Sequence, residues 1–237
     1  MEPQELARFM NRYYEAIFKP TRHHGGVVSD IIGDSMMALW VASRPETSPK
    51  DKACFAAVDI QKSMEQFNQS SGAVELNTRI GIHSGHISLG HIGAIDHYEY
   101  RPVGDIVNTS SRVEGLNKHL GTRILASEEV IHRLDGFLMR EVGKFRLKGK
   151  AEPITIYELM CRIEESDENQ RRDCAVFAEA MGAFRTQSWD EAMEKFHQCL
   201  ENRGKDGPSL FYAGLCEQYR QTPPEEPWDG VVHMEKK

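Results

Sequence analysis

The side chains best suited to chemistry lie on a predicted helix within RPVGDIVNTSSRVEGLNKHLG, residues 101–121. Asn108 and Arg112 are four residues apart, so their side chains share one helix face and can hold one ligand. An amide and a planar guanidinium suit a phosphate group or a developing oxyanion. Such a pair on an exposed helix is more often simply solvated, so its function depends on the residues around it.

A second polar stretch is HHGGVVSDIIGDSMMALW, residues 23–40, where two apolar runs meet at the tight turn Gly33-Asp34. The runs predict two strands joined by that turn, with Asp30 and Asp34 on either side of its tip. A turn aspartate needs no function, since Asp and Gly are common in tight turns. The pattern therefore predicts where two carboxylates lie and leaves open what they bind.

The elements that must position these side chains alternate between helix and strand. Helical spacing of apolar residues predicts helices over 3–18, 50–69 and about 105–119. Within TRIGIHSGHISLGHIG, residues 78–93, apolar residues alternate around glycines, as in a β-hairpin. Further strands are predicted at TRILA, FLMREVGKFRLKGK and ITIYELM. This order of elements indicates an α+β fold in which helices cover a mixed sheet.

The composition changes after residue 160. Residues 161–172 are mostly polar and predict a linker, and residues 173–237 have helical spacing. Small and aromatic residues in this tail resemble one tetratricopeptide-like hairpin plus a third helix. A lone repeat cannot bury its own face, so we expect the tail to pack on the main domain or on a partner. A helical cap is favoured over a peptide-binding array, because arrays need about three or more repeats.

Charge and cysteine content exclude several classes of protein. The 237 residues carry a net charge of −7, which argues against a general nucleic-acid or anionic-membrane binder. No apolar run approaches the roughly 20 residues of a membrane span. The odd, scattered set of five cysteines predicts reduced thiols in the cytoplasm, with neither a disulfide framework nor a zinc site.

Three stretches together resemble the class III adenylate/guanylate cyclase catalytic domain over residues 1 to about 160: HGGVVSDIIGDSMMALW, then TRIGIHSGHISLGHIG with YRPVGDIVNTSSRVEGLNK, then GKFRLKGKAEPITIYEL. The resemblance implies a ferredoxin-like fold that works as a head-to-tail homodimer with two shared sites. The implied reaction converts a nucleoside triphosphate to a 3′,5′-cyclic monophosphate and pyrophosphate by in-line attack of the ribose 3′-oxygen. Two divalent ions, Mg²⁺ or Mn²⁺, serve each site in the family. The tail resembles that of bacterial members with a membrane-linked sensor upstream.

The resemblance assigns roles to individual residues. Asp34 matches one of the family's two metal-binding aspartates, and Asn108 matches the residue that orients the ribose. Arg112 matches the arginine that stabilises charge on the α-phosphate in the transition state. Lys148 matches a lysine that reaches the triphosphate, with Lys150 as a neighbour that can be confused with it. The glycines of GIHSGHISLGHIG are interpreted as turn and packing residues. The histidines of this segment, together with His23 and His24, are interpreted as surface or packing residues.

The sequence departs from the family at its start. The family's other metal aspartate lies in a strand of the form D-I-x-G-F/Y-T, and this sequence starts inside the helix that follows it. We therefore expect the first core strand and its phosphate-cradling loop to be missing. An N-terminally clipped fragment is favoured over a natural variant that cannot hold two metal ions. Residues 1–237 alone are expected to bind nucleotide weakly and to turn it over little or not at all.

A second departure concerns the base. Adenylate-making members usually place lysine at the position of Asp30 and aspartate or threonine at that of Arg101, so the charges are reversed here. Both residues are implied to face the purine, and the pair suits adenine or guanine. We favour ATP over GTP because the motifs as a set resemble the bacterial adenylate type. A regulatory cyclase-like chain without turnover, and a scaffold that recruits partners through its tail, remain alternative hypotheses.

Overall fold

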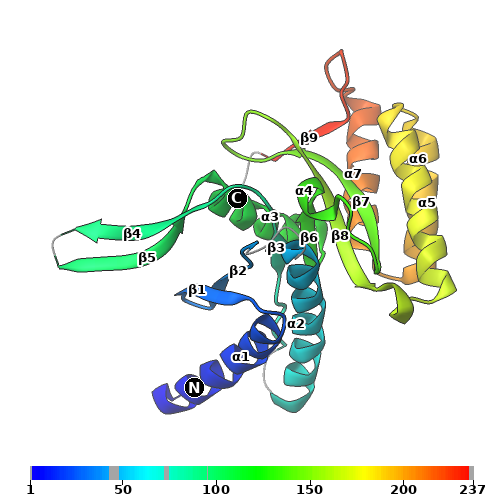
Figure 1. Cartoon of the computed structure of the whole chain (residues 1–237). Coiled ribbons are helices and arrows are strands. Elements are labelled where there is room, and N and C mark those ends of the chain that lie inside the picture. The colour runs from blue at the N-terminus through cyan, green and yellow to red at the C-terminus, as the bar shows by residue number, and fades with distance from the viewer. Residues whose placement is uncertain (1, 43–47, 72–74, 95, 235–237) are drawn as a thin grey trace. The chain divides into compact units, whose positions relative to one another are not determined.

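The computed structural model describes residues 2–42, 48–71, 75–94 and 96–234 of the chain (Figure 1). These residues form two compact units. The first contains residues up to 78 together with 84–110, and the second contains 79–83 together with 111–237. No helix in the described ranges combines the length and the apolar character that crossing a bilayer requires.

The first unit contains a pair of packed helices and a pair of antiparallel strands. Helices α1 (Pro3–His23) and α2 (Pro49–Ser71) pack against each other, with the Phe9 and Phe67 rings 5.3 Å apart in an edge-on arrangement. Strands β1 (Val27–Ile32) and β2 (Ser35–Leu39) pair antiparallel around the predicted tight turn. Both helices extend beyond the predicted ranges: α1 continues by five residues to His23, and α2 gains one residue at its start and two at its end.

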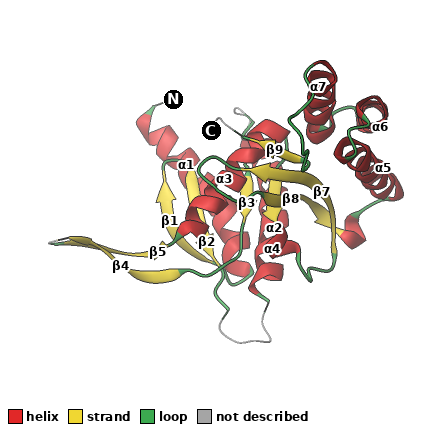
Figure 2. Cartoon of the chain, turned by 90° about the horizontal axis from the view of Figure 1, so that it is seen from above, coloured by secondary structure: helices red, strands yellow, loops and turns green. Residues whose placement is uncertain are grey.

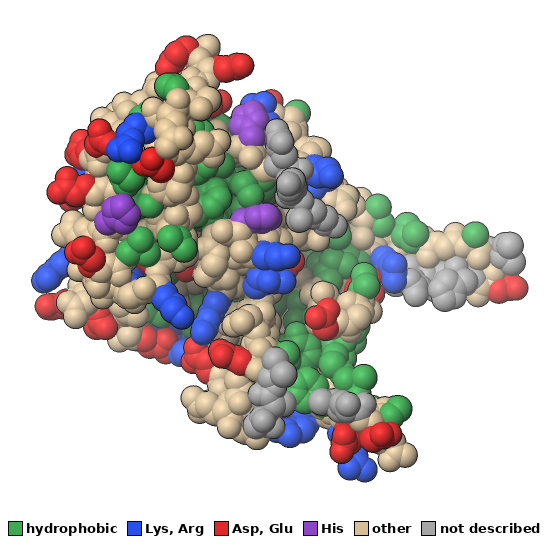
Figure 3. Space-filling view, turned by 180° about the vertical axis from the view of Figure 1, so that it is seen from behind, with side chains coloured by type: hydrophobic (Ala, Val, Ile, Leu, Met, Phe, Trp, Pro, Cys, Tyr) green, Lys and Arg blue, Asp and Glu red, His purple; other side chains and the backbone are tan. Residues whose placement is uncertain are grey.

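A long two-stranded ribbon completes the first unit. Strands β4 (Ser88–Ala94) and β5 (His97–Val103) pair antiparallel, and Figure 2 shows them as an extended ribbon. Hydrophobic side chains stay exposed at its base, where Leu89 is 39% and Val103 is 45% exposed (Figure 3). The hairpin predicted within residues 78–93 is wrong in its pairing: β3 (Ile80–Ile82) pairs with β6 (Ile124–Ser127), and β4 pairs with β5. Alternation of apolar residues identifies strands, but it does not say which strands pair.

The second unit is built on a five-stranded mixed sheet with the strand order β3-β6-β8-β7-β9. The β3–β6 and β7–β9 pairs are parallel, and the β6–β8 and β7–β8 pairs are antiparallel. This mixed sheet confirms the predicted α+β fold. The bounds of its remaining strands are β6 (Ile124–Ser127), β7 (Phe137–Arg146), β8 (Ile154–Arg162) and β9 (Val231–His233).

Helix α3 (Asp105–Leu120) confirms the helix predicted over 105–119, and it begins in the first unit and ends in the second. The short helix α4 (Glu128–Ile131) follows β6. On α3 the buried side chains Val113, Leu116 and Leu120 recur at helical spacing and enter the core of the second unit. The face that carries Asn108 and Arg112 is thereby fixed, because burial of one stripe sets the rotation of the helix.

The helical tail shares this core. Helices α5 (Glu168–Arg185), α6 (Trp189–Arg203) and α7 (Gly207–Gln221) lie side by side (Figures 1 and 2). Residues 161–172, where the sequence predicts a linker, hold the end of β8, one 3-10 turn at Ile163–Glu165 and the start of α5. The tail therefore packs on the sheet, in one cluster with these fully buried members: Val113, Phe145, Ile156, Phe177, Phe184, Phe196 and Tyr212.

Candidate functional site

The hairpin tip at Asp34 is held by its backbone. Gly33 has a φ of +63°, a left-handed conformation that glycine adopts without strain. The hydroxyl of Tyr13 donates to the carbonyl oxygen of Asp34 at 3.2 Å, and that of Tyr14 donates to the carbonyl oxygen of Gly33. Burial raises the pKa of Tyr13, with a smaller contribution from the Asp34 carboxylate. Two tyrosines of α1 thus fix the turn while Asp34 stays exposed to solvent.

A divalent ion needs more oxygen ligands than this tip provides. Magnesium and manganese ions prefer several oxygen ligands, and a carboxylate is a suitable one. Across residues 2–42, 48–71, 75–94 and 96–234, no three His, Cys, Asp or Glu side chains gather closely enough to hold a metal ion. Asp34 has the right donor chemistry, but one carboxylate does not complete a site. The described residues therefore do not fit a metal by themselves.

The two residues predicted to face the base contact each other. Nη2 of Arg101, on β5, lies 3.4 Å from both carboxylate oxygens of Asp30, on β1. The Asp30 side chain is 13% exposed and the Arg101 side chain is 41% exposed, so the acid is the more sheltered partner. Asp30 Oδ1 also accepts from the backbone N–H of Ile31 at 3.1 Å. A base that uses both groups must compete with this long, partly exposed ion pair, which is a weak one.

Asn108 and Arg112 both lie on α3, as predicted. The Asn108 side chain is exposed, in the part of α3 that belongs to the first unit. Arg112 is partly buried, in the part that belongs to the second unit, and its Nη1 is buried with no hydrogen-bond partner among the described residues. A buried guanidinium N–H without an acceptor is unfavourable, and a bound anion would satisfy it.

Lys148 lies in a tight turn directly after β7. The backbone N–H of Lys150 donates to the carbonyl oxygen of Leu147 at 2.9 Å and closes the turn. Leu147 is buried and anchors the turn in the core, whereas the Lys148 side chain is exposed. Gly149 of this turn lies against the guanidinium of Arg112. Two of the predicted phosphate-binding cations, Arg112 and Lys148, are therefore close together within the second unit.

The six predicted site residues divide between the two units. Asp30, Asp34, Arg101 and Asn108 belong to the first unit, and Arg112 and Lys148 belong to the second. Within the first unit the structure brings Asp30 and Arg101 into contact, and within the second it brings the turn of Lys148 to Arg112. Helix α3 carries predicted site residues of both units, because Asn108 belongs to the first unit and Arg112 to the second.

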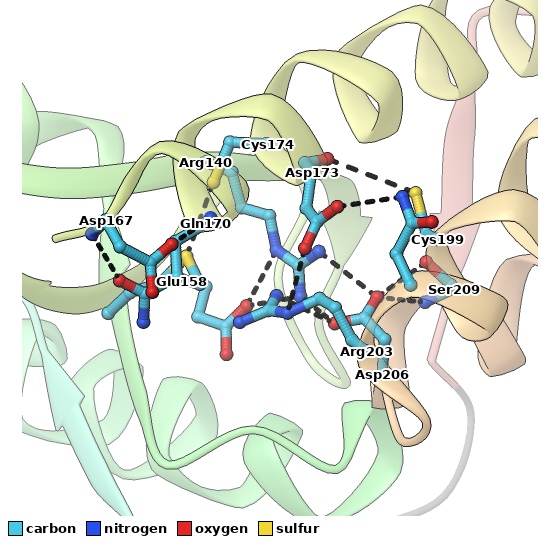
Figure 4. A network of polar contacts seen from close by, with 12 residues as sticks. Arg140, Glu158, Asp167, Gln170, Asp173, Cys174, Cys199, Arg203, Asp206 and Ser209 are labelled. Carbon is cyan, nitrogen blue, oxygen red and sulfur yellow. Dashed lines mark hydrogen bonds and ion pairs between the residues drawn. The ribbon is translucent and has the colours of Figure 1, made fainter.

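Sequence reasoning missed a buried ionic network centred on Arg140 of β7, shown in Figure 4. Its Nη1 donates to Asp206 at 3.1 Å, its Nε donates to Glu158 at 2.8 Å, and its guanidinium stacks on Phe177 at 4.4 Å. Burial lowers the pKa of Arg140, but Glu158 and Asp206 outweigh it, so the pKa is raised. The signal was available: a charged residue at an inward-facing strand position is rare unless it is paired.

Asp206 has three further contacts in this network. It is the N-cap of α7 and accepts from the backbone N–H of Ser209 at 3.1 Å. It also accepts from the Ser209 hydroxyl and from Arg203. Burial raises the pKa of Asp206, but Arg140 outweighs it, so the pKa is lowered. The network connects the sheet to the start of α7.

Comparison with known proteins identifies the family. The model of the "Adenylate and Guanylate cyclase catalytic domain" family matches residues 1–160. The chain belongs to this family. It is 34% identical over 162 residues to adenylate cyclase 1 of Rhizobium meliloti (strain 1021), a match that covers 67% of this chain and 24% of the relative. It is 35% identical over 170 residues to the adenylate cyclase of Anabaena cylindrica, covering 67% of this chain and 33% of the relative.

A third relative extends the similarity into the tail. The terminal-differentiation specific adenylate cyclase of Dictyostelium discoideum is 28% identical over 232 residues, covering 92% of this cyclase-family chain and 10% of the relative. The chain thus spans a third or less of the length of each of these three curated relatives.

Solved structures agree with the family. The guanylyl cyclase Cya2 superposes with a TM-score of 0.59 at 25% identity, covering 70% of this chain and 86% of that one. The guanylate cyclase domain of RhGC from Catenaria anguillulae, solved in complex with GTP, gives a TM-score of 0.57 at 25% identity, covering 68% and 87%. The adenylyl cyclase CyaB from P. aeruginosa, at 24% identity and a TM-score of 0.58, supports the fold alone.

Proposed function

We propose that this chain is the catalytic region of an adenylate cyclase that converts ATP to 3′,5′-cyclic AMP and pyrophosphate for intracellular signalling. The ribose 3′-oxygen attacks the α-phosphorus in line and loses its proton. The new oxygen–phosphorus bond closes the ring, and the bond to pyrophosphate breaks. Little covalent chemistry falls to the protein, so its contribution is positioning and stabilisation of charge.

The observation that carries this proposal is a buried guanidinium N–H group of Arg112, in a chain that belongs to the cyclase family. Its buried Nη1 lacks a partner among the described residues, and it lies four residues after Asn108 on α3. A guanidinium in this state is suited to the α-phosphate, whose charge grows in the transition state. In this proposal Asn108 orients the ribose and Lys148, on the neighbouring turn, neutralises the triphosphate.

Divalent ions enter the proposal through the family. Cyclases of this family generally use Mg²⁺ or Mn²⁺. We propose Asp34 as one carboxylate ligand, since it is exposed at a turn whose backbone two tyrosines hold. Because the remaining ligands are not among the described residues, the roles given to Asn108, Arg112 and Lys148 do not depend on where an ion binds.

Base selection rests on Asp30 and Arg101. With adenine, Asp30 accepts from the exocyclic amino group and Arg101 donates to a ring nitrogen; with guanine, Asp30 accepts from N1–H and Arg101 donates to O6. ATP is favoured because the two relatives at 34% and 35% identity are named adenylate cyclases. GTP is the alternative, and the RhGC domain bound to GTP supports it. A discriminating pair of this kind is worth roughly 1–3 kcal/mol.

We propose that the active form is a head-to-tail homodimer with two shared sites, each built from residues of both chains. Apolar side chains exposed on the first unit support an association surface: Val27 is 64% exposed and Ile32 is 68% exposed. Sedimentation of the protein at increasing concentration tests this, and a monomer at all concentrations in the presence of nucleotide would contradict it.

A second candidate function is a regulatory cyclase-like chain that binds nucleotide without turnover. The single carboxylate at the hairpin tip favours it. The presence of Asn108 and Arg112, four residues apart on α3, opposes the regulatory alternative. In the proposed reaction these residues orient the ribose and stabilise charge on the α-phosphate, and binding without turnover does not need both roles.

Product analysis separates the two candidates. The chain, and a version extended at its N-terminus by a family strand with the second aspartate, are incubated with ATP or GTP and Mn²⁺, and products are identified by mass spectrometry. We expect cyclic AMP from the extended version, and a loss of at least about a hundredfold in Arg112→Ala. Lys118→Ala, an exposed lysine on the same helix, is the matched control and keeps the rate. Nucleotide binding without any cyclic product would favour the regulatory alternative.

A further inference from the structure

The turn that follows β7 has a fixed conformation and a fixed position. Its closing hydrogen bond joins Lys150 N–H to Leu147 C=O at 2.9 Å, and Gly149 has a φ of +72°. This is the pattern of a type II turn, whose third residue is normally glycine. Leu147 is buried in the same core cluster as Val113, the neighbour of Arg112 on α3. The turn and this part of α3 are thus held against each other by shared packing within one unit.

The guanidinium of Arg112 lies directly over the bare Cα of Gly149. A Cβ on Gly149 would lie 3.3 Å from Nη2, 3.8 Å from Cζ and 4.0 Å from Nη1 of Arg112. The first distance is shorter than nine in ten real Cβ contacts, so the guanidinium would have to move by a few tenths of an ångström. A side chain at position 149 would therefore displace Arg112 from its present position.

Contact with the turn holds the guanidinium of Arg112 without occupying its Nη1 group. An arginine fixed by a carboxylate has its donors occupied, whereas Nη1 of Arg112 is buried without a partner among the described residues. Packing on Gly149 restricts the guanidinium without using an N–H group. The same turn carries Lys148, so one short segment sets the position of two cations.

We propose that Gly149 is a positioning residue: its missing side chain seats the Arg112 guanidinium against the turn and leaves Nη1 free to donate to a phosphate. This rests on the proposed role of Arg112 in phosphate binding and goes beyond it, because it assigns to Gly149 a function in addition to its place in the type II turn. An error of about 1 Å in the position of a catalytic group can reduce a rate about a hundredfold.

The chain contains a closely matched control. Gly204, at the end of α6 in the same unit, has a φ of +70°, and a Cβ placed on it meets nothing within 4 Å. Gly149→Ala and Gly204→Ala therefore both place an alanine at positive φ, and only the first meets a guanidinium. Gly149→Asn is the second variant, because asparagine tolerates the left-handed conformation and still brings a Cβ.

The test uses a readout that does not require turnover. The Nε–H resonance of Arg112 is identified in an NMR spectrum by its loss in Arg112→Lys, and inorganic tripolyphosphate is titrated as the probe. We expect Gly149→Ala and Gly149→Asn to shift this resonance and to weaken tripolyphosphate binding about tenfold. Gly204→Ala should lower the melting temperature, because it strains the backbone at positive φ, and should leave both readouts at the wild-type values.

The outcomes separate this inference from the proposed function. Identical Arg112 resonances and equal tripolyphosphate affinities in Gly149→Asn and wild type would overturn the positioning role, whatever the activity. An extended version, with the family strand and its aspartate, that cyclises neither ATP nor GTP would contradict the proposed function, and the shift of the Arg112 resonance would still decide the role of Gly149. In an active protein, Gly149→Ala is expected to reduce kcat more than it changes KM, since Arg112 acts most strongly in the transition state.

Discussion

Removal of the Asp206 carboxylate tests whether the tail and the sheet form one cooperative unit. The side chains of Asp206 and Arg140 are 4% and 2% exposed, so Asp206→Ala leaves a buried guanidinium with Glu158 as its remaining charged partner. Breaking a buried ion pair by removing one partner costs about 3–5 kcal/mol, and loss of an N-cap costs about 1 kcal/mol. These terms overlap, and Glu158 offsets part of the loss, so we expect a loss of about 4 kcal/mol from the free energy of unfolding.

Urea unfolding measured by tryptophan fluorescence gives this number. Trp189 and Trp228 lie 6.1 Å apart in the tail, so their emission reports on the second unit. With an m value of about 2 kcal/mol/M, the midpoint should fall by about 2 M. Asp190→Ala is the control: its side chain is 81% exposed and pairs with Arg220 on the surface, so the change should stay below about 0.5 kcal/mol. Equal midpoints for the two variants would refute the reasoning.

Three further predictions follow from the contacts of single residues. The pKa of Asp206 is lowered in the folded state, so the contribution of its carboxylate to the free energy of unfolding is present above its unfolded pKa, near 4. This contribution is lost as pH falls through the lower folded pKa. Asp206→Ala should therefore flatten this part of a titration of stability with acid. Gly207→Ala places a Cβ 2.0 Å from the carbonyl oxygen of Leu120, so a loss of at least about 2 kcal/mol is expected in thermal unfolding, whereas Gly214→Ala in the same helix should be neutral or stabilising. Asp30→Ala should change the ratio of kcat/KM for ATP and GTP by about five- to a hundredfold, measured with both nucleotides in competition, and an unchanged ratio would remove Asp30 from base recognition.

Local signals in the sequence were sufficient for most elements. The apolar spacing of α3 predicted its range to within one residue of the observed end at Leu120, because one stripe of that helix is buried. The segments of β7 and β8 were predicted as strands, and Gly33-Asp34 predicted the tight turn between β1 and β2. These features depend on neighbours within a few residues of one another.

Features that depend on distant parts of the chain were not predictable in the same way. The strand β9, three residues long, is stabilised by pairing with β7 about 90 positions earlier, and its own sequence contains no strong signal. Arg140 and Asp206 are 66 residues apart, and Asp30 and Arg101 are 71 apart. Single-sequence patterns do not identify such partners, although they do identify the charged residues that need one.

In the candidate site, too, the features set by local sequence were predicted and the contacts between distant residues were not. Its residue types came from resemblance to a family, and α3 and the turn at Gly33-Asp34 were predicted locally. The turn at residues 147–150 was not predicted, because it lies at the end of a segment predicted as strand, and β7 ends at Arg146. The contact between Arg112 and Gly149 was not predicted, because a glycine leaves no side-chain pattern to interpret. The hydroxyls of Tyr13 and Tyr14 on the hairpin tip were also missed, since both residues fit the apolar stripe of α1 equally well.

The central claim is that this chain is the catalytic region of a nucleotidyl cyclase, and phosphorus NMR of one reaction tests it most directly. The version extended by a family strand is incubated with ATP and Mn²⁺, the ion is removed with a chelator at each time point, and all phosphorus species are quantified. Cyclisation predicts 3′,5′-cyclic AMP and pyrophosphate in equal amounts, and neither in Arg112→Ala. Release of inorganic phosphate with ADP, or equal product from wild type and Arg112→Ala, would contradict the account.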